Sequence, residues 1–435
     1  MLSKQQLAAI EHPILCDCPL GKIFLPCLLM KVLVFAHTPP PHHGQSYMVQ
    51  MMLENVGKPG PAADELIFYH VNARFSEGMD DIGSWRMGKL FLLLRYVLQA
   101  WRLRWKFAPT ALYYVPAPAK RSALYRDWLV LLLVAPLFRV RIFHWHSIGL
   151  GQWVIEGATQ GAVRRCEAWI TRRLFSGKEL SLVLNEQGRS DIEVFSPRRI
   201  AVVPNGIPDP CPDFASALLP ERLLRWRKQS EPGEKPLFEL LYLAHATHTK
   251  GLFDAIDAIA LANAQFVAEK NTARFRLTVA GAFLSREEET AFQERIKQDD
   301  LALTTGAAPD RAVVYAGYVG PQEKDRLLRV CDALCFPSYY PNEGQPVSII
   351  EALAYGMPVL LSRWRGLPEM VPALLAHLTE PRDPASLARA LPLLLNEGRF
   401  DEYRKCYLER YSLAAHCQRM REAFLSADIR SDEKN

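Results

Sequence analysis

Two glutamates with seven residues between them lie in the segment PSYYPNEGQPVSIIEALAYGMPVL, at positions 337–360. Glu343 follows a run typical of a strand, in a loop rich in glycine and proline, and Glu351 lies about one turn into a helix expected to begin near Pro346. The beginning of a helix presents unpaired backbone N–H groups and the positive end of the helix dipole, which favour a bound anion. Two carboxylates beside such an anion can accept hydrogen bonds from sugar hydroxyl groups. Taken alone, the pair also fits an exposed glutamate and a helix-capping glutamate.

A lysine precedes a second expected helix, in the segment LYLAHATHTKGLFDAIDAIA at positions 241–260. The order of strand, polar loop, Lys250-Gly251 and amphipathic helix is typical of a phosphate site. A lysine there can neutralise the charge of a diphosphate leaving group. His245 ends the strand and is largely neutral at pH 7 unless a phosphate raises its pKa. It is therefore either a ligand or a strand-end histidine that bonds to the backbone.

Two further candidates come from the N-terminal half of the chain. Gly44 precedes an expected helix, and a glycine there lets the backbone approach a pyrophosphate, although a simple turn glycine fits equally well. His144 and His146 alternate at the end of the expected strand at 140–146 and therefore point to the same face. His144, the inner of the two, is expected to be a buried histidine with its own partners.

The segment at 337–360 resembles the E-x7-E motif of family-four retaining glycosyltransferases of the GT-B fold, the glycosyl transferases group 1. The flanking sequences PS, EALAYGMPV and RGLPEMV match as well. The resemblance runs from Met30 to about Leu425 and is more specific in the C-terminal half. It implies that Glu343 lies near the donor sugar, that Glu351 holds the nucleotide ribose, and that backbone N–H groups after Glu343 contact sugar or phosphate. The donor site that the resemblance implies consists of Gly44, His245, Lys250, Gly251, Gly281, Glu343, Gly344, Gln345, Pro346, Val347 and Glu351.

The chain departs from the family pattern at the phosphate site. The family reads G-R-L-x-x-x-K-G and clamps the diphosphate with its arginine and lysine; here Lys250 matches, and Ala244 and His245 replace the first glycine and the arginine. The family commonly has Gly-Gly or Gly-x-Ser at Gly44, and Gln45 replaces the second glycine. A strand-end histidine of the family faces the donor sugar across the cleft. The catalytic residues that the resemblance implies are His146, Lys250 and Glu343.

Apolar runs typical of strands alternate with helix-length segments in two series along the chain. Such alternation predicts βαβ units and parallel sheets. We therefore expect an α/β protein with two doubly wound, Rossmann-like domains that face a cleft, and ligands beyond the carboxyl ends of the strands. The turn Asn205-Gly206 is predicted to be structural, near the approach to the second domain. The expected divisions are an N-terminal extension at 1–29, an acceptor-binding domain at 30–207, a linker at 208–236, a nucleotide-sugar-binding domain at 237–408, and a helix returning to the first domain with a tail at 409–435.

Composition limits the classes of function. Of the 435 residues, 49% are hydrophobic and 23% are charged, which is typical of a soluble globular enzyme. The formal net charge of +5 fits a phosphate-bearing substrate or an anionic membrane surface and is too small to indicate nucleic acid. The nine cysteines have neither a disulfide framework nor zinc-site spacing, which predicts free thiols in a reducing compartment. No apolar run reaches the roughly 20 residues that span a bilayer, so we expect a cytoplasmic protein.

The segment at 85–107 is apolar and basic at helical spacing. We expect one face made of Leu90, Leu94, Val97 and Trp101, and another made of Arg95, Gln99, Arg102 and Lys106. Two roles fit this pattern. The helix either docks on the sheet of the first domain with a solvated cationic face, or makes peripheral contact with an anionic membrane, where lipid-linked acceptors lie.

These features and the resemblance together predict a retaining, hexosyltransferase-like glycosyltransferase. It would move a sugar from a nucleotide-diphospho-sugar to a saccharide or lipid-linked acceptor, in cell-surface polysaccharide or glycolipid synthesis. The nucleotide sugar is a substrate, and no cofactor is expected. Asp-x-Asp does not occur in the sequence, which argues against a metal-bound diphosphate, so no metal is expected either. The alternatives are a nucleotide-sugar epimerase of the same fold and a catalytically inactive protein that binds sugar nucleotides.

Overall fold

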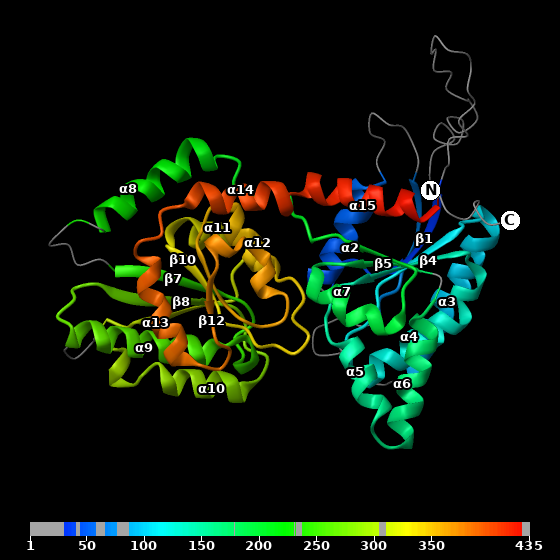
Figure 1. The fold of residues 1–435 in the computed structure, drawn as a ribbon, viewed down its shortest axis with the longest axis horizontal. Coiled ribbons are helices and arrows are strands. Elements are labelled where there is room, and N and C mark those ends of the chain that lie inside the picture. The colour runs from blue at the N-terminus through cyan, green and yellow to red at the C-terminus, as the bar shows by residue number, and fades with distance from the viewer. Residues whose placement is uncertain are drawn as a thin grey trace, which may run out of the picture.

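The computed structural model describes residues 30–40, 44–57, 66–75, 87–177, 179–229, 231, 237–303 and 310–428. They form two lobes, each built on a six-stranded parallel sheet (Figure 1). The N-terminal sheet has the order β2 (Leu66–Asn72), β1 (Met30–Ala36), β3 (Ala111–Tyr114), β4 (Val140–Trp145), β5 (Glu179–Val183) and β6 (Arg199–Val202). The C-terminal sheet has the order β12 (His377–Thr379), β11 (Val359–Ser362), β10 (Ala333–Phe336), β7 (Leu237–Leu243), β8 (Arg274–Ala280) and β9 (Val313–Gly317). The predicted α/β architecture of two doubly wound sheets is confirmed.

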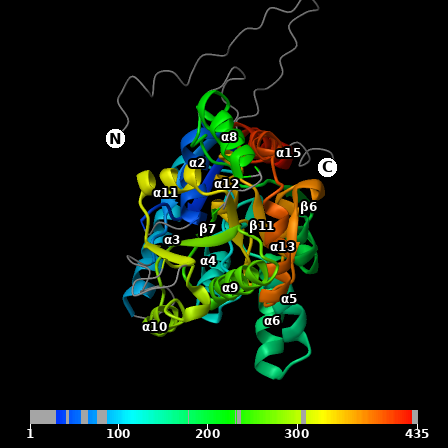
Figure 2. The same ribbon diagram turned by 90° about the vertical axis from the view of Figure 1, so that its left-hand side faces the viewer.

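Helices cover both faces of each sheet (Figures 1 and 2). In the N-terminal lobe, one face is covered by α2 (Gly44–Asn55) and α15 (Leu413–Asp428), and the other by α3 (Met87–Phe107), α4 (Arg121–Leu133), α5 (Leu150–Ala158) and α6 (Ala162–Phe175). Helix α7 (Glu186–Ile192) follows β5. In the C-terminal lobe, one face is covered by α9 (Leu252–Ala268), α10 (Arg286–Arg295) and α13 (Pro384–Leu394), and the other by α8 (Leu219–Gln229), α11 (Pro321–Val330), α12 (Val347–Ala354) and α14 (Phe400–Arg410). Because both faces are covered, the strands are apolar on both sides; in β1 every residue except Lys31 is buried.

The chain crosses between the lobes twice, and the two crossings are hydrogen-bonded to each other. The N–H of Ile207 donates to the carbonyl of Tyr411 at 3.0 Å, and the N–H of Leu413 donates to the carbonyl of Ile207 at 2.8 Å. Helix α14 ends in the C-terminal lobe, and α15 continues onto the N-terminal lobe (Figure 1). A Cβ on Gly206 would lie 2.3 Å from the Cβ of His416, so the first crossing needs glycine where α15 passes it.

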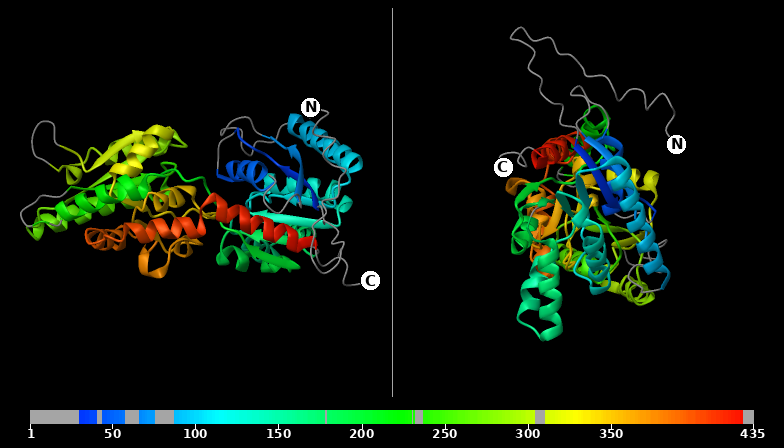
Figure 3. Two further views of the ribbon diagram at one scale, coloured as in Figure 1. Left: turned by 90° about the horizontal axis from the view of Figure 1, so that it is seen from above. Right: turned by 90° about the vertical axis from the view of Figure 1, so that its right-hand side faces the viewer.

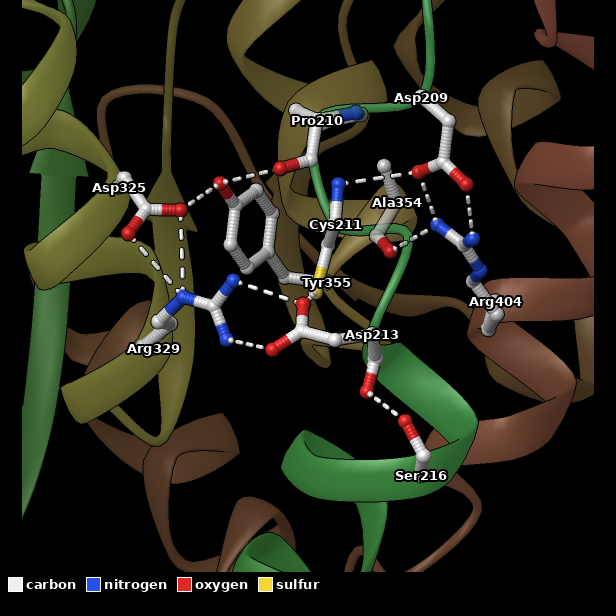
Figure 4. Close-up of polar contacts among 10 residues, drawn as sticks. All are labelled: Asp209, Pro210, Cys211, Asp213, Ser216, Asp325, Arg329, Ala354, Tyr355 and Arg404. Atoms are coloured by element: carbon white, nitrogen blue, oxygen red, sulfur yellow. Dashed lines mark hydrogen bonds and ion pairs between the residues drawn. The ribbon is translucent and has the colours of Figure 1, made fainter.

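The segment after the first crossing, within the expected linker at 208–236, is fixed to the C-terminal lobe by two ion pairs (Figure 4). Arg404 of α14 donates to Asp209 at 2.8 Å. Arg329 of α11 donates to both carboxylate oxygens of Asp213, at 2.9 and 3.0 Å. These hydrogen bonds lower the pKa of Asp213 to about 2, so its carboxylate is charged at neutral pH. The segment continues into a π-helical turn, Phe214–Leu218, and helix α8.

Helix α3 buries a different set of residues from the one we expected. Three residues at the spacing i, i+4, i+7 are buried against the sheet: Leu93, Val97 and Ala100. Leu90 and Leu94, which we grouped with Val97, are exposed, and Trp101 is only partly buried. The prediction was wrong because nearly every position near the start of this helix is apolar, so periodicity alone does not fix which residues face the sheet.

Two properties of the described residues bear on the class of protein. None of the helices in this part of the chain is both long and apolar enough to cross a membrane. The described cysteines are free, as the sequence predicts: Cys166, Cys211, Cys331, Cys335, Cys406 and Cys417.

Candidate functional site

A cleft of about 400 Å³ lies between the lobes, beyond the carboxyl ends of strands from both sheets. The strand order reverses at β1 and β3 in the N-terminal sheet and at β7 and β10 in the C-terminal sheet. Ligands of doubly wound folds bind at such switch points. Of the predicted site residues, those that line the cleft are Gly44, His146, His245, Lys250, Glu343, Gly344, Gln345, Pro346 and Val347. Gly251, Gly281 and Glu351 do not belong to this lining.

Lys250 and Glu343 form an ion pair in this cleft. The Nζ of Lys250 lies 2.7 Å from Oε2 of Glu343, and both side chains are largely buried, with 17% and 7% of their surface exposed. The hydroxyl of Ser338 donates to the same oxygen. A cation and a carboxylate, 93 positions apart in the sequence, therefore meet at one point of the cleft.

The close packing of two loops places this lysine. Thr247 accepts a hydrogen bond from the N–H of Lys250 at 3.3 Å and so begins the short 3₁₀ helix His248–Lys250. Gly251 ends that helix with a φ of +76°, and a Cβ on it would lie 2.2 Å from the carbonyl oxygen of Pro337. Glycine is thus required both by the left-handed backbone and by the loop after β10, which carries Glu343. Gly251 contributes by letting the two loops approach each other.

The loop that follows Glu343 touches the N-terminal lobe. A Cβ on Gly344 would lie 2.3 Å from the carbonyl oxygen of His146. The side chain of Gln345 spans the two lobes: its oxygen accepts from the N–H of Asn205 at 2.6 Å, and its amide donates to the carbonyl of Leu184 at 3.4 Å. The amide side chain of Gln345 is therefore committed to contact between the lobes.

Glu351 lies one turn beyond Val347 on α12, outside the cleft lining. It forms an ion pair with Lys324 of α11. It also lies near Tyr47 of α2, whose pKa is raised first by burial and then by the charge of Glu351. The two glutamates thus flank the beginning of α12, but they face different partners.

Two of the predicted histidines, His245 and His144, have lowered pKa values, and His146 lines the cleft. Burial, and then the charge of Lys250, lower the pKa of His245, so this cleft residue carries little charge at pH 7. His146 lines the cleft, and its ring centre lies 4.1 Å from that of His144. His144 is buried, with Nδ1 2.6 Å from the hydroxyl of Tyr113, as an inner histidine with a partner was expected to be. Burial holds the pKa of His144 well below its ordinary value.

Several lining residues were not predicted as site residues. Tyr340, Asn342 and Ser348 lie within the segment at 337–360, so their closeness to Glu343 in the sequence was an available signal. Pro118 comes from the loop after β3, where no residue type pointed to a site. Gly281 packs on the neighbouring strand end, since a Cβ on it would lie 1.7 Å from the carbonyl oxygen of Ala244. Close packing explains this glycine without a ligand.

Comparison with known proteins finds a family match in the second lobe. Residues 225–410 match the glycosyl transferases group 1 family. This group 1 segment contains Lys250, Glu343 and Glu351, together with the whole C-terminal sheet and most of the helices of that lobe.

Curated relatives of the chain are distant. Glycogen synthase of Mycobacterium tuberculosis (strain ATCC 25618 / H37Rv) is 28% identical over 283 residues, which are 62% of this chain and 59% of the relative. The amylovoran biosynthesis glycosyltransferase AmsK of Erwinia amylovora is 27% identical over 166 residues, 37% of each chain. The chain thus spans 59% of the length of the glycogen synthase that it matches.

Solved structures extend the similarity to both lobes. Sucrose-phosphate synthase from Thermosynechococcus elongatus has a TM-score of 0.59 at 17% identity, over 91% of this chain and 98% of its own. Alr3699/HepE of Anabaena, solved in complex with UDP-glucose, has a TM-score of 0.59 at 15% identity, over 91% of this chain and 100% of its own. These similarities and the two parallel sheets show the GT-B fold of glycosyltransferases.

Proposed function

We propose that this protein is a retaining glycosyltransferase that moves a sugar from a nucleotide-diphospho-sugar to a saccharide or lipid-linked acceptor. The observation that carries the proposal is the Lys250–Glu343 pair in a cleft between two lobes, inside the segment that matches the group 1 family. The C-terminal lobe binds the donor, and the N-terminal lobe binds the acceptor. We place this activity in the cytoplasm, in the synthesis of a cell-surface polysaccharide or glycolipid. The name of AmsK, an amylovoran biosynthesis enzyme, supports that role.

Lys250 and the beginning of α12 stabilise the leaving diphosphate. Negative charge builds on the diphosphate oxygens as the bond to the sugar breaks, so groups that hold this charge lower the barrier. Lys250 supplies a positive charge, and Gly344, Gln345 and Val347, which carry backbone N–H groups, belong to the same cleft lining. The dipole of α12, which begins at Val347, has the same sign. His245 adds hydrogen bonding without a full charge, because its pKa is lowered.

Glu343 and His146 hold the sugar from opposite lobes. Both described hydrogen bonds to the Glu343 carboxylate use Oε2, which leaves Oε1 to accept from a sugar hydroxyl. The acceptor hydroxyl oxygen attacks the anomeric carbon on the face from which the diphosphate leaves. The carbon–oxygen bond to the diphosphate breaks, and the diphosphate takes the proton of the hydroxyl. The anomeric configuration is kept.

A donor screen tests the proposal. The protein is incubated with a panel of nucleotide sugars, with and without candidate acceptors, and mass spectrometry follows donor hydrolysis and transfer. We expect release of a nucleoside diphosphate from one class of donor, unchanged by a metal chelator. A chelator-sensitive activity that magnesium or manganese restores would contradict the metal-free mechanism.

Two variants complete the test. Glu343→Ala should lower turnover at least about a hundred-fold, since it removes the sugar contact and leaves Lys250 unpaired. Glu409→Ala, at an exposed glutamate of α14, is the matched control and should leave turnover unchanged. Equal turnover in the two variants would remove Glu343 from the site. Conversion of donor without acceptor would indicate an epimerase instead, and tight binding of nucleoside diphosphates without turnover would indicate an inactive binding protein.

A further inference from the structure

Three neighbouring helices on one side of the N-terminal lobe carry exposed charges of a single sign, and α5 on the same side adds one exposed acid, Glu156. Helices α3, α4 and α6 lie on the same face of the sheet (Figures 1 and 3), and α4 lies between the other two. Among their described side chains, every exposed charged residue is a cation: Arg95, Arg102, Lys106, Arg121, Arg165, Arg172 and Arg173. The acids of these helices, Asp127 and Glu167, are both buried and paired with arginines. We call this surface the α3–α4–α6 face.

Large apolar side chains stand beside these cations. On α3, Phe91, Leu98 and Trp105 are exposed to 72%, 62% and 70%, at spacings that place them along one side of the helix. Arg95, Arg102 and Lys106 run beside them on the same helix. On α6, Trp169 is 67% exposed, and Arg165, Arg172 and Arg173 surround it along the helix surface. Large exposed apolar side chains grouped in this way favour a surface that contacts something other than water.

We propose that the α3–α4–α6 face binds the surface of an anionic lipid membrane. Cations attract the negative headgroups, and apolar and aromatic side chains beside them enter the boundary between headgroups and acyl chains. Tryptophan is suited to that boundary because its ring is apolar and its N–H is polar. The inference goes beyond glycosyl transfer, since binding to lipid requires neither a donor nor an acceptor.

Charge favours lipid over other occupants. In a symmetric dimer the face of one copy would meet the same face of the other, and the facing arginines would repel each other. A nucleic acid would neutralise the cations but would leave Phe91, Leu98 and Trp105 in water. An anionic membrane is complementary to both the cations and the exposed apolar side chains, because its headgroups are negatively charged and its acyl chains beneath them are apolar.

The test is binding of the full chain to vesicles. The protein is mixed with vesicles of phosphatidylcholine, or of equal parts phosphatidylcholine and phosphatidylglycerol, and is then sedimented. We expect co-sedimentation with the anionic vesicles only. The triple variant Arg165→Gln, Arg172→Gln, Arg173→Gln should weaken this partitioning roughly a hundred-fold at low salt. The triple variant Phe91→Ser, Leu98→Ser, Trp105→Ser should weaken the binding that persists at physiological salt at least about ten-fold.

A charge-matched control separates the face from net charge. Lys297→Gln, Arg389→Gln, Lys405→Gln removes three exposed cations from the C-terminal lobe and should leave partitioning unchanged. The proposal is overturned if the wild type does not sediment with anionic vesicles, if it binds neutral vesicles equally, or if the control loses as much binding as the α6 variant. It is also overturned if ultracentrifugation finds a dimer that the face variants convert to monomers. Because lipid binding is measured without substrate, its failure leaves glycosyl transfer untouched, and the converse also holds.

Discussion

Replacing Lys250 with glutamine tests the centre of the proposed mechanism. Two unit charges about 4 Å apart interact by about 4 kcal/mol at the dielectric that describes partly buried pairs. Part of this attraction already goes to Glu343, whose Oε2 lies 2.7 Å from the ammonium, so we expect a loss of about 3–4 kcal/mol of transition-state stabilisation. The ratio kcat/KM for the donor should therefore fall roughly a hundred- to a thousand-fold. Steady-state kinetics with the donor found in the screen measures this ratio.

The effect of the Lys250→Gln substitution on stability must be measured separately from its effect on catalysis. Glu343 keeps its bond from Ser338 when Lys250 is lost, so the free energy of unfolding should fall by only about 1–2 kcal/mol. Urea denaturation measures that change, and Lys250→Arg, which keeps the charge, should recover part of the activity. Lys405→Gln, at an exposed lysine of α14, is the control for loss of one charge. A Lys250→Gln enzyme with kcat/KM within a few-fold of the wild type would refute the reasoning.

Three further predictions concern a glycine beside Lys250, a carboxylate of the segment after the first crossing, and a histidine of the cleft. Gly251→Ala should destabilise the protein by about 2 kcal/mol or more in urea denaturation, because Gly251 has a φ of +76° and lies against the carbonyl of Pro337. An unchanged denaturation midpoint would mean that the loops carrying Gly251 and Pro337 can move apart at little cost. Arg329 lowers the pKa of Asp213 from 3.8 to about 2, so this carboxylate stabilises the fold above about pH 4 and loses that effect as the pH falls toward 2. Asp213→Asn should flatten this part of the dependence of unfolding free energy on pH, and an identical slope in both proteins would contradict the pairing. His245→Arg should tighten the binding of a nucleoside diphosphate about five- to ten-fold in calorimetry, since it adds the charge that the neutral histidine lacks; unchanged or weaker affinity would place His245 away from the diphosphate.

The sequence predicted the features that depend on strand order and on local glycine chemistry. Alternating strands and helices gave two parallel sheets, and the carboxyl-end rule brought Lys250 and Glu343 to one cleft although they are far apart in the chain. At Asn205-Gly206 the structure requires glycine because α15 passes close to Gly206, and Asn205 also lines the cleft. These inferences use rules that hold within one sheet or one turn, so a single sequence is enough for them.

The features that sequence reasoning missed depend on how distant elements pack. The side chain of Gln345 bonds to the other lobe, and no local pattern reports the distance between two lobes. Glu351 meets Lys324 of α11 and does not line the cleft, which follows from the rotation of α12 against its neighbour. In α3 the choice between Leu90 and Leu93 as the buried position depends on the sheet beneath, because both are leucines in an apolar run.

The paired crossings at Ile207 and Leu413 constrain how substrates enter and leave. Two segments of the chain pass side by side from one lobe to the other and are hydrogen-bonded at that point. They can therefore act as a hinge between the lobes. Opening of the cleft about this point would keep these bonds but would break the contacts of Gln345 with Asn205 and Leu184. In such a motion, the edge of the cleft farthest from Ile207 and Leu413 moves the most. Removal of α15 would take away one of the two crossings and would uncover the apolar surface that Met420 and Phe424 cover.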